Sequence, residues 1–268
     1  MTKSKKLWIL IGLLIIANII YYIGQWGGET YVLYISDILP VICSFISILC
    51  LFYAFSGFKT FDFTKTAWLM ILIGIFLFFL AETTYAIEEI ALKWDMNEVY
   101  PSIADIFWCT AYIPMVIGLG MMFYGYKKSG FPMGNSKLYN AFSILFFLFA
   151  VTVIYFLLIP IIKDPETDFI TKFFYLFYPI ADLLLVIPAV ILMYITSLFG
   201  IGSISKPWKY LAFGFILFTI ADLLYSYLGW LDLYGNGNLI DVAWHAGYLL
   251  IGLAGLYQRE LIESLKKV

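Results

Sequence analysis

The fold class of this chain can be read from residues 66–90, TAWLMILIGIFLFFLAETTYAIEEI. No charged residue occurs between Lys65 and Glu82, and the run between them consists almost entirely of large apolar side chains. A helix needs about 20 such residues to cross the hydrocarbon core of a bilayer. The stretch therefore predicts a membrane-spanning helix with Glu82 and Tyr85 inside it.

The rest of the chain has the same character. Hydrophobic residues make up 63% of the sequence and charged residues 13%, against roughly 45–50% and about 25% in soluble domains. We therefore expect an all-α fold, a single integral membrane domain over residues 1–268 with eight transmembrane helices. The predicted spans are 7–24, 31–56, 66–90, 101–126, 137–162, 168–199, 206–229 and 238–260.

A short motif recurs along the chain: a small or apolar residue, a polar residue, and a tyrosine three positions after the polar one. Its copies are Ala17-Asn18…Tyr21, Ala81-Glu82…Tyr85, Val151-Thr152…Tyr155 and Ala221-Asp222…Tyr225, and each precedes a segment with an aspartate near its start, Asp37, Asp105, Asp182 and Asp241. Self-similar segments at a regular spacing indicate one repeated supersecondary unit. We predict four parallel-repeated helical hairpins, at about 7–56, 66–126, 137–199 and 206–260.

The second and fourth hairpins match best, without gaps. Trp68, Gly74, Phe78, Ala81, Glu82 and Tyr85 align with Trp208, Gly214, Phe218, Ala221, Asp222 and Tyr225. In the following helices, Asp105, Trp108 and Tyr112 align with Asp241, Trp244 and Tyr248. Hairpins repeated in the same orientation imply a rotation axis along the membrane normal, unlike the inverted repeats of many transporters.

The basic residues predict the orientation in the membrane. All sixteen lysines and arginines except Lys93, Lys163 and Lys172 lie at the two ends of the chain or in the second, fourth and sixth loops. Loops rich in lysine and arginine stay in the cytoplasm. We expect a multi-pass protein of the cell membrane with both termini cytoplasmic.

The repeated polar positions should meet at one depth. Glu82 and Asp222 lie some fifteen residues from the cytoplasmic ends of their helices, roughly 22 Å along a core of about 30 Å. Asp105 and Asp241 lie about one turn from the outer ends of theirs. The sequence thus predicts an outward-facing, acidic, aromatic-lined vestibule. Its predicted ligand-binding residues are Glu82, Tyr85, Asp105, Trp108, Tyr112, Asp222, Tyr225, Asp241, Trp244, His245 and Tyr248.

Each acid also has a structural interpretation. Glu82 and Asp222 would lock the bundle through hydrogen bonds to neighbouring helices, although ionisable groups in membrane helices usually mark a site or pathway. Asp105 fits a capping box with Ser102 after Pro101.

Three further polar side chains also have a possible structural role. Asp37 and Asp182 lie beside prolines, which favours a structural role. His245, the only histidine, follows Asp241 by one turn. Either the carboxylate of Asp241 raises the pKa of His245 and makes it a proton sensor, or His245 is simply a hydrogen-bond partner of Asp241.

Several classes of protein are disfavoured. No lysine lies deep in a helix for retinal, and one histidine cannot form a bis-histidine haem or a multi-histidine zinc site. We predict no cofactor and no metal, and a cation site formed by Glu82, Asp105, Asp222 and Asp241 remains an alternative. No basic face exists for nucleic acid.

The segments Pro101-Ser102-Ile103-Ala104-Asp105-Ile106-Phe107-Trp108…Tyr112 and Leu239-Ile240-Asp241-Val242-Ala243-Trp244…Tyr248 carry a resemblance. They resemble the multi-helix membrane sensor regions that precede diguanylate cyclase, EAL phosphodiesterase or histidine kinase domains. The resemblance implies a sensor. Because the chain shows no such output domain, we expect signalling through a cytoplasmic or membrane partner.

The expected function is therefore that of a membrane sensor or ligand-binding module for a small or lipid-like ligand. Membrane lipid is expected to surround the protein, and binding is favoured over catalysis. A weaker likeness to lysoplasmalogenase-type hydrolases, with Glu82 and Asp222 at the matching positions, leaves a lipid hydrolase as an alternative. A proton- or cation-coupled transporter is the other, although the helices lack paired glycine and proline breaks.

Overall fold

The computed structural model describes residues 2–96, 99–130, 132–199 and 202–266, and within them every regular element is helical. Each predicted span corresponds to one helix or one nearly continuous helical run. The elements are α1 (Lys3–Gly24), α2 (Glu29–Phe55), α3 (Phe63–Ala86) with a π-helical end (Ile87–Ala91), α4 (Ile103–Lys128), α5 (Ser136–Val153), a π-helical turn (Ile154–Leu158), α6 (Ile159–Lys163), α7 (Phe169–Ser197), α8 (Gly202–Trp230) and α9 (Asp241–Leu265).

Polar residues fix where several helices begin. At five helix starts, a capping side chain accepts a hydrogen bond from a backbone N–H in the first turn. The capping residues are Thr2, Asp62, Ser102, Asn135 and Asp168. These N–H groups have no partner within the helix, so a capping side chain supplies one. The boundaries are therefore set locally by sequence.

In the described part of the chain, seven helical segments are long and apolar enough to cross a membrane. Such a set of helices indicates a multi-pass membrane protein. The eighth long helix, α9, is not among the seven because it carries more polar residues, including Asp241, His245 and Gln258. It is also the most sheltered, since it packs against α1, α2 and α8 and most of its length to Gln258 is buried.

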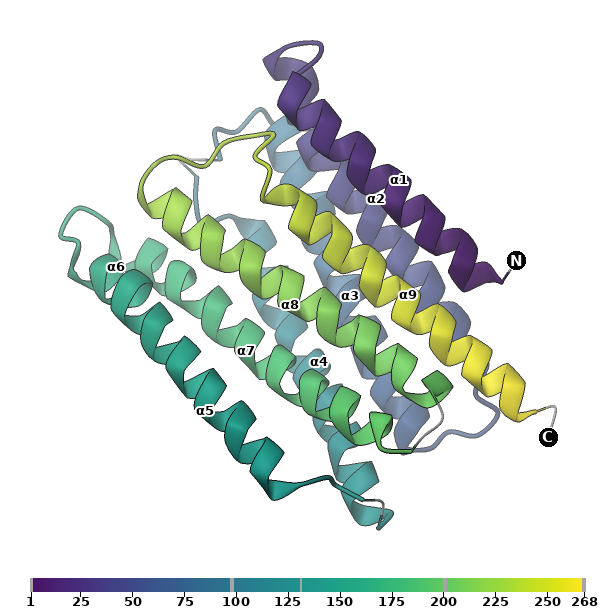
Figure 1. The fold of residues 1–268 in the computed structure, drawn as a ribbon. Coiled ribbons are helices and arrows are strands. Elements are labelled where there is room, and N and C mark those ends of the chain that lie inside the picture. Colours follow the sequence, from purple (N-terminus) through teal and green to yellow (C-terminus); the bar gives the residue numbers. More distant parts are fainter. Residues whose placement is uncertain (1, 97–98, 131, 200–201, 267–268) are drawn as a thin grey trace.

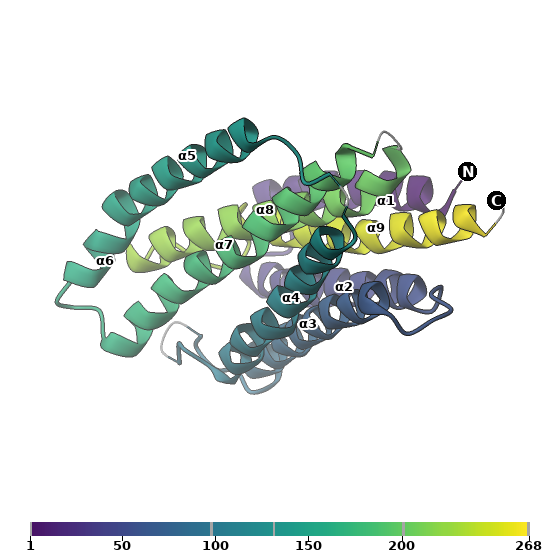
Figure 2. The ribbon, with the colours of Figure 1, turned by 90° about the horizontal axis from the view of Figure 1, so that it is seen from below.

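Six helices form a closed ring. The contacts run from α2 to α3, α4, α7, α8, α9 and back to α2. In projection the ring consists of two rows, with α2, α3 and α4 in one and α9, α8 and α7 in the other (Figure 2). Both chain termini lie at the same end of the bundle (Figure 1).

The two rows meet in the middle through aromatic pairs between α3 and α8. The rings of Trp68 and Trp208 lie 5.4 Å apart, and those of Phe78 and Phe218 lie 5.6 Å apart. Both tryptophans are almost completely buried. Each pair joins two positions that the sequence alignment makes equivalent.

The outer helices differ from the predicted hairpins. α1 packs chiefly against α9 rather than against α2. Two polar contacts hold it there: Asn18 Oδ1 lies 2.9 Å from His245 Nδ1, and Ser4 Oγ donates to Glu260 Oε2 at 3.0 Å. α5 has no buried residue and stands apart from the ring (Figure 2). Apolar side chains that need no protein partner can face lipid, which explains why sequence similarity did not determine these contacts.

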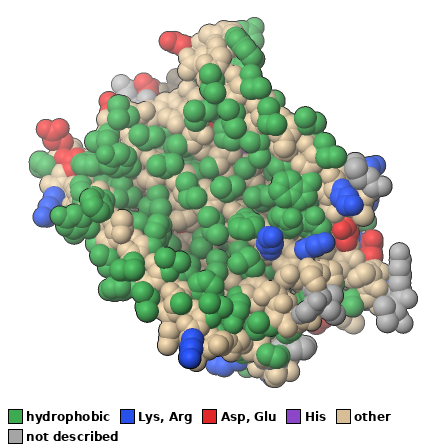
Figure 3. All heavy atoms as spheres, viewed as in Figure 1, with side chains coloured by type: hydrophobic (Ala, Val, Ile, Leu, Met, Phe, Trp, Pro, Cys, Tyr) green, Lys and Arg blue, Asp and Glu red, His purple; other side chains and the backbone are tan. Residues whose placement is uncertain are grey.

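The surface agrees with a membrane environment. Hydrophobic side chains cover most of the face in Figure 3, and charged side chains gather toward the ends of the helices. Lys267, one of the basic residues that predicted the orientation, lies outside the described residues.

Two glycines of α4 offer a matched test of helix packing. A Cβ atom on Gly118 would lie 2.7 Å from the backbone oxygen of Ala67 on α3, whereas a Cβ on Gly120 would meet nothing within 4 Å. We expect Gly118→Ala to lower the free energy of unfolding by about 1 to 3 kcal/mol through overpacking. Gly120→Ala should be neutral or stabilising by up to about 1 kcal/mol. Unfolding in mixed detergent micelles measures both, and equal effects would contradict the close approach of α3 and α4.

Candidate functional site

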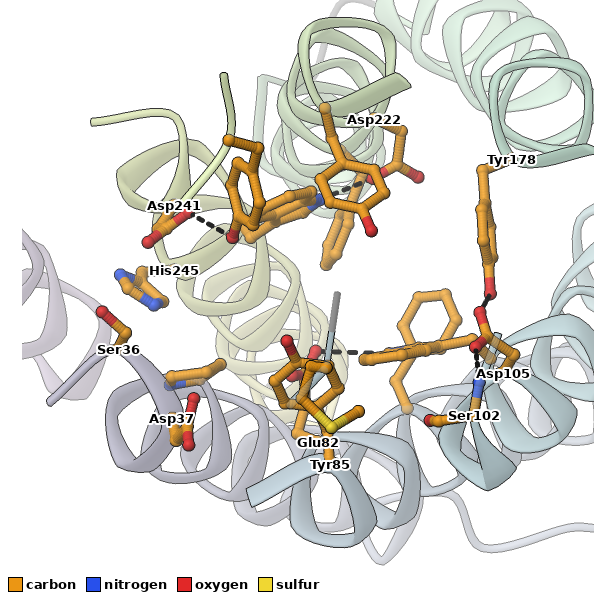
Figure 4. Close-up of a pocket in the computed structure, with 18 of the residues that line it drawn as sticks. Ser36, Asp37, Glu82, Tyr85, Ser102, Asp105, Tyr178, Asp222, Asp241 and His245 are labelled. Carbon is orange, nitrogen blue, oxygen red and sulfur yellow. Dashed lines mark hydrogen bonds between the residues drawn. The ribbon is translucent and has the colours of Figure 1, made fainter. Parts of the chain in front are cut away.

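A cavity of about 140 Å³ lies inside the ring, toward the end opposite the termini. It is lined by side chains from all six ring helices and from the loops before α4 and α9 (Figure 4). All eleven residues predicted from the sequence lie on its wall: Glu82, Tyr85, Asp105, Trp108, Tyr112, Asp222, Tyr225, Asp241, Trp244, His245 and Tyr248.

Aromatic rings form one side of this cavity. Phe78 and Phe218 precede Glu82 and Asp222 by one helical turn, on the side of the chain termini. Tyr248 packs edge-on against both phenylalanines, with ring centroids 6.1 Å and 4.8 Å apart. This apolar floor separates the carboxyl groups above it from the tryptophan pair deeper in the bundle.

Glu82 is held by two donors from different helices. Its Oε1 accepts a hydrogen bond from Trp108 Nε1 on α4 at 3.4 Å and from the Tyr248 hydroxyl on α9 at 2.5 Å. Both bonds end on the same oxygen, and the side chain is only half-buried. The second oxygen, Oε2, is therefore the one with capacity for a further partner.

Asp222 is held in the corresponding way. Its Oδ1 accepts from Trp244 Nε1 on α9 at 2.6 Å, and its Oδ2 lies 3.4 Å from the Tyr112 hydroxyl on α4. The same hydroxyl lies 2.8 Å from Asp182 Oδ1 on α7. A tyrosine hydroxyl carries one proton, so Asp182 and Asp222 compete for it.

The two acids thus form a reciprocal arrangement. Each accepts from a tryptophan on the next helix of its own hairpin and from a tyrosine on the other hairpin. Glu82 and Asp222 lie on opposite sides of the cavity (Figure 4). The structural interpretation of these acids is correct in that they cross-link the two hairpins, and they also face open space.

Asp105 is a helix cap and a cavity residue at once. Its Oδ2 accepts from the backbone N–H of Ser102 at 2.8 Å, and the Ser102 hydroxyl accepts from the N–H of Ala104 at 3.1 Å, which completes the predicted capping box. The remaining oxygen, Oδ1, accepts from the Tyr178 hydroxyl of α7. This bond joins α4 to α7 and so closes the ring.

Asp241 begins α9 and is buried. Its Oδ1 accepts from the Tyr234 hydroxyl at 3.0 Å, and Tyr234 belongs to the loop before α9. Burial, with a smaller effect from the charge of Asp241, raises the pKa of Tyr234 well above its ordinary value. The hydroxyl therefore remains protonated and keeps its role as a donor at physiological pH.

His245 has a different partner from the one expected. It lies one turn beyond Asp241, but its Nδ1 pairs with Asn18 of α1. The first copy of the repeated motif therefore serves to attach α1 to the cavity wall. The third copy does not reach the cavity: Tyr155 is 64% exposed, and the Thr152 hydroxyl donates to the carbonyl oxygen of Leu148 in its own helix.

The sequence missed several lining residues. Asp37, interpreted as structural, lies on the cavity wall, whereas Asp182, which shares the Tyr112 hydroxyl with Asp222, does not line it. Burial raises the pKa of a further loop residue, Tyr100, well above its ordinary value. The repeat had marked Asp37, Phe78 and Phe218 as equivalent positions without assigning them to the site, and it did not mark the loop residues Met96, Tyr100, Tyr234 and Asn236. The missed set comprises Ser36, Asp37, Pro40, Phe78, Met96, Tyr100, Ser102, Tyr178, Phe218, Tyr234 and Asn236.

The acids do not converge on one point. Among the described residues, no three side chains of histidine, cysteine, aspartate or glutamate are close enough together to hold a metal ion. Glu82, Asp105, Asp222 and Asp241 are instead distributed around the wall. A comparison with known protein families, curated proteins and solved structures finds no match to this chain.

Proposed function

We propose that this protein is a membrane receptor module whose cavity binds a small ligand and reports its presence to a signalling partner. The single observation that supports the proposal most is the cavity itself. Eleven polar and aromatic residues, selected by their spacing in the sequence, line one hollow from four different helices. Placing ionisable groups inside membrane helices costs free energy, and one shared binding site would account for all of them.

The distribution of basic residues supports one orientation of this cavity in the membrane. We infer that both termini are cytoplasmic, because the basic residues gather at that end. The cavity lies toward the other end, which makes it accessible from outside the cell. α9 is counted as the eighth span, since α1, α2 and α8 shield its polar residues from lipid.

We further infer that the chain contains a structural repeat. The aligned pairs Trp68–Trp208 and Phe78–Phe218 are each in contact across the centre of the bundle, as a two-fold axis between α3 and α8 requires. Gly74 and Gly214 are likewise equivalent. A Cβ atom on either would lie 3.0 Å from a backbone oxygen of the next helix of its hairpin. We therefore infer that the chain consists of two equivalent halves of four helices each, rather than four equal hairpins.

The resemblance to bacterial sensor regions suggests how binding would be reported. A second hollow, of about 750 Å³, lies at the terminal end of the bundle on α3, α4, α8 and α9. The same four helices carry Glu82, Trp108, Asp222 and Trp244. A change in their packing around a ligand would therefore reach the end where a cytoplasmic partner docks.

A binding screen tests the proposal. We expect at least one compound in a library of small polar and lipid-like molecules to raise the melting temperature of the purified protein. The double variant Glu82→Gln with Asp222→Asn should remove this shift or reduce the affinity at least about tenfold, because hydrogen bonds to charged groups contribute about 1.5–3 kcal/mol each.

The control for this screen is Asp62→Asn, which changes an exposed acid at the opposite end of α3. It should leave the ligand response unchanged. An unaltered response in the folded double variant would contradict the proposed site. Turnover of labelled lipids would instead indicate a hydrolase, and ion flux in proteoliposomes would instead indicate a transporter.

A further inference from the structure

The cavity is lined by carboxyl groups without a lysine or arginine to balance them. Five of its lining residues are acids, each from a different helix, and none of its lining residues is a lysine or arginine. Within the described residues, the one ion pair joins Arg259 to Glu263, at the terminal end of α9. Buried carboxyl groups are costly unless a positive partner or hydrogen bonds compensate them. The lining acids are Asp37, Glu82, Asp105, Asp222 and Asp241.

Two of these acids have an unused buried oxygen. Asp37 and Asp241 are each only 4% exposed, and in each the described residues place no hydrogen-bond donor on Oδ2. Buried polar atoms in folded proteins nearly always have a partner, so each exception calls for an explanation. These two sealed oxygens show that the protein itself does not compensate the carboxyl groups around the cavity.

The remaining wall is aromatic. Ring centroids lie 5.9 Å apart for Tyr85 and Trp108, and 5.8 Å apart for Tyr225 and Trp244. The ring of Tyr234 lies 4.8 Å from that of Tyr225. Both indole N–H groups are already committed to carboxyl groups. What the two tryptophans can offer a ligand is therefore ring surface, which attracts organic cations.

A bare metal ion fits this lining poorly. Calcium and magnesium need a cage of several oxygen ligands around one point, and the described acids do not converge in that way. An anionic ligand would meet five acids and no cation. A cation that carries methyl or methylene groups fits both features, since its charge faces carboxylates and its apolar surface faces rings.

We propose that the cavity binds a compact organic ammonium ion, with Glu82 and Asp222 supplying charge and Trp108 and Trp244 supplying aromatic contact. This inference rests on the proposed receptor function and names the chemical class of its ligand. The ammonium group belongs either to a soluble amine such as choline or to the headgroup of a choline lipid. Both share the same recognition chemistry, and the experiment separates them.

Calorimetric titration of the full chain in phosphatidylglycerol nanodiscs tests the charge. Choline and tetramethylammonium should bind saturably. The uncharged carbon analogue of choline, 3,3-dimethylbutanol, should bind at least about tenfold more weakly, because it has the same shape but no charge for ring or carboxylate. Equal affinity for the analogue would overturn the proposal.

Variants of one tryptophan test the aromatic contact. Trp244→Leu should weaken choline binding about tenfold, whereas Trp244→Phe, which keeps a ring and loses the N–H, should retain most of the affinity. Trp8→Leu is the matched control: this tryptophan is 41% exposed on α1, contacts Tyr210 and does not line the cavity, so its replacement should leave choline binding unchanged. Melting temperature and elution volume verify that each variant is folded. Equal losses for Trp244→Leu and Trp244→Phe would overturn the aromatic role.

The source of the ammonium group is decided by repeating the titration in phosphatidylcholine nanodiscs. A weaker apparent affinity for choline identifies the lipid headgroup as a competitor, and an unchanged affinity identifies a soluble amine. If no ammonium ion binds while another compound stabilises the protein, the cation inference fails and the receptor function stands. If no compound of any class binds, both fail.

Discussion

Trp68→Ala is expected to lower the free energy of unfolding by about 3 to 5 kcal/mol, the usual cost of removing a large buried aromatic side chain. Trp68 is fully buried and packs on Trp208 at 5.4 Å, so its loss leaves a void between α3 and α8. Unfolding by a denaturing detergent, followed by circular dichroism, measures the change. Trp8→Ala provides the control. Trp8 is 41% exposed and its Nε1 donates to the Tyr210 hydroxyl at 3.2 Å, so its loss should cost about 1 to 2 kcal/mol, less than that of Trp68.

The same experiment also bears on the proposed repeat. Trp208 occupies the aligned position and is equally enclosed, so Trp208→Ala should have a cost similar to that of Trp68→Ala. A double variant should cost less than the sum of the two, since the side chains contact each other. A cost for Trp68→Ala no larger than that for Trp8→Ala would contradict the packing of the two rows of helices.

Asp105→Ala should lower the free energy of unfolding by about 2 to 4 kcal/mol. The substitution removes the capping-box acceptor for Ser102, worth about 0.5–2 kcal/mol. It also leaves the buried hydroxyl of Tyr178 without an acceptor, which costs about 1–3 kcal/mol. Equilibrium unfolding in mixed micelles measures the total.

A second capping acid separates the two contributions. Asp62 accepts from the backbone N–H of Lys65 at 2.9 Å at the start of α3, and it is exposed. Asp62→Ala should therefore show only a capping loss of about 1 kcal/mol. Tyr178→Phe in the Asp105→Ala background should recover part of the stability, because it removes the stranded hydroxyl. No recovery would show that the bond to Tyr178 contributes little.

The dual role of Asp105 explains why the sequence left its interpretation open. The sequence left capping and ligand contact as alternatives for this residue. Its carboxylate has two oxygens, and each accepts a hydrogen bond from a different part of the protein. Oδ2 completes the cap, and Oδ1 reaches α7. The capping half was predictable, because it depends on residues three positions apart. The contact with Tyr178 joins segments 73 residues apart and had no signal in the local pattern.

The repeated motif was a good guide in two of its four copies. The copies at Glu82 and Asp222 lie on α3 and α8, which face each other across the centre of the bundle, and bring their acids to one cavity. The copy at Asn18 instead fastens α1 to α9, and the copy at Thr152 faces away from the ring. The motif describes a position along a helix, whereas the use of that position depends on which neighbour the helix meets.

Local sequence patterns were enough to predict the helices, their bounds to within about five residues, and eleven of the residues that line the cavity. These properties are local, since they depend on the length of apolar runs, on capping residues and on the spacing of side chains along one helix. Which helices touch one another depends on the folded arrangement. Lipid tails are as apolar as leucine, so hydrophobicity does not select one helix as the partner of another. Close approach at Gly118 and hydrogen bonds such as that from Tyr248 to Glu82 make that selection, and both require the partner helix to be in place.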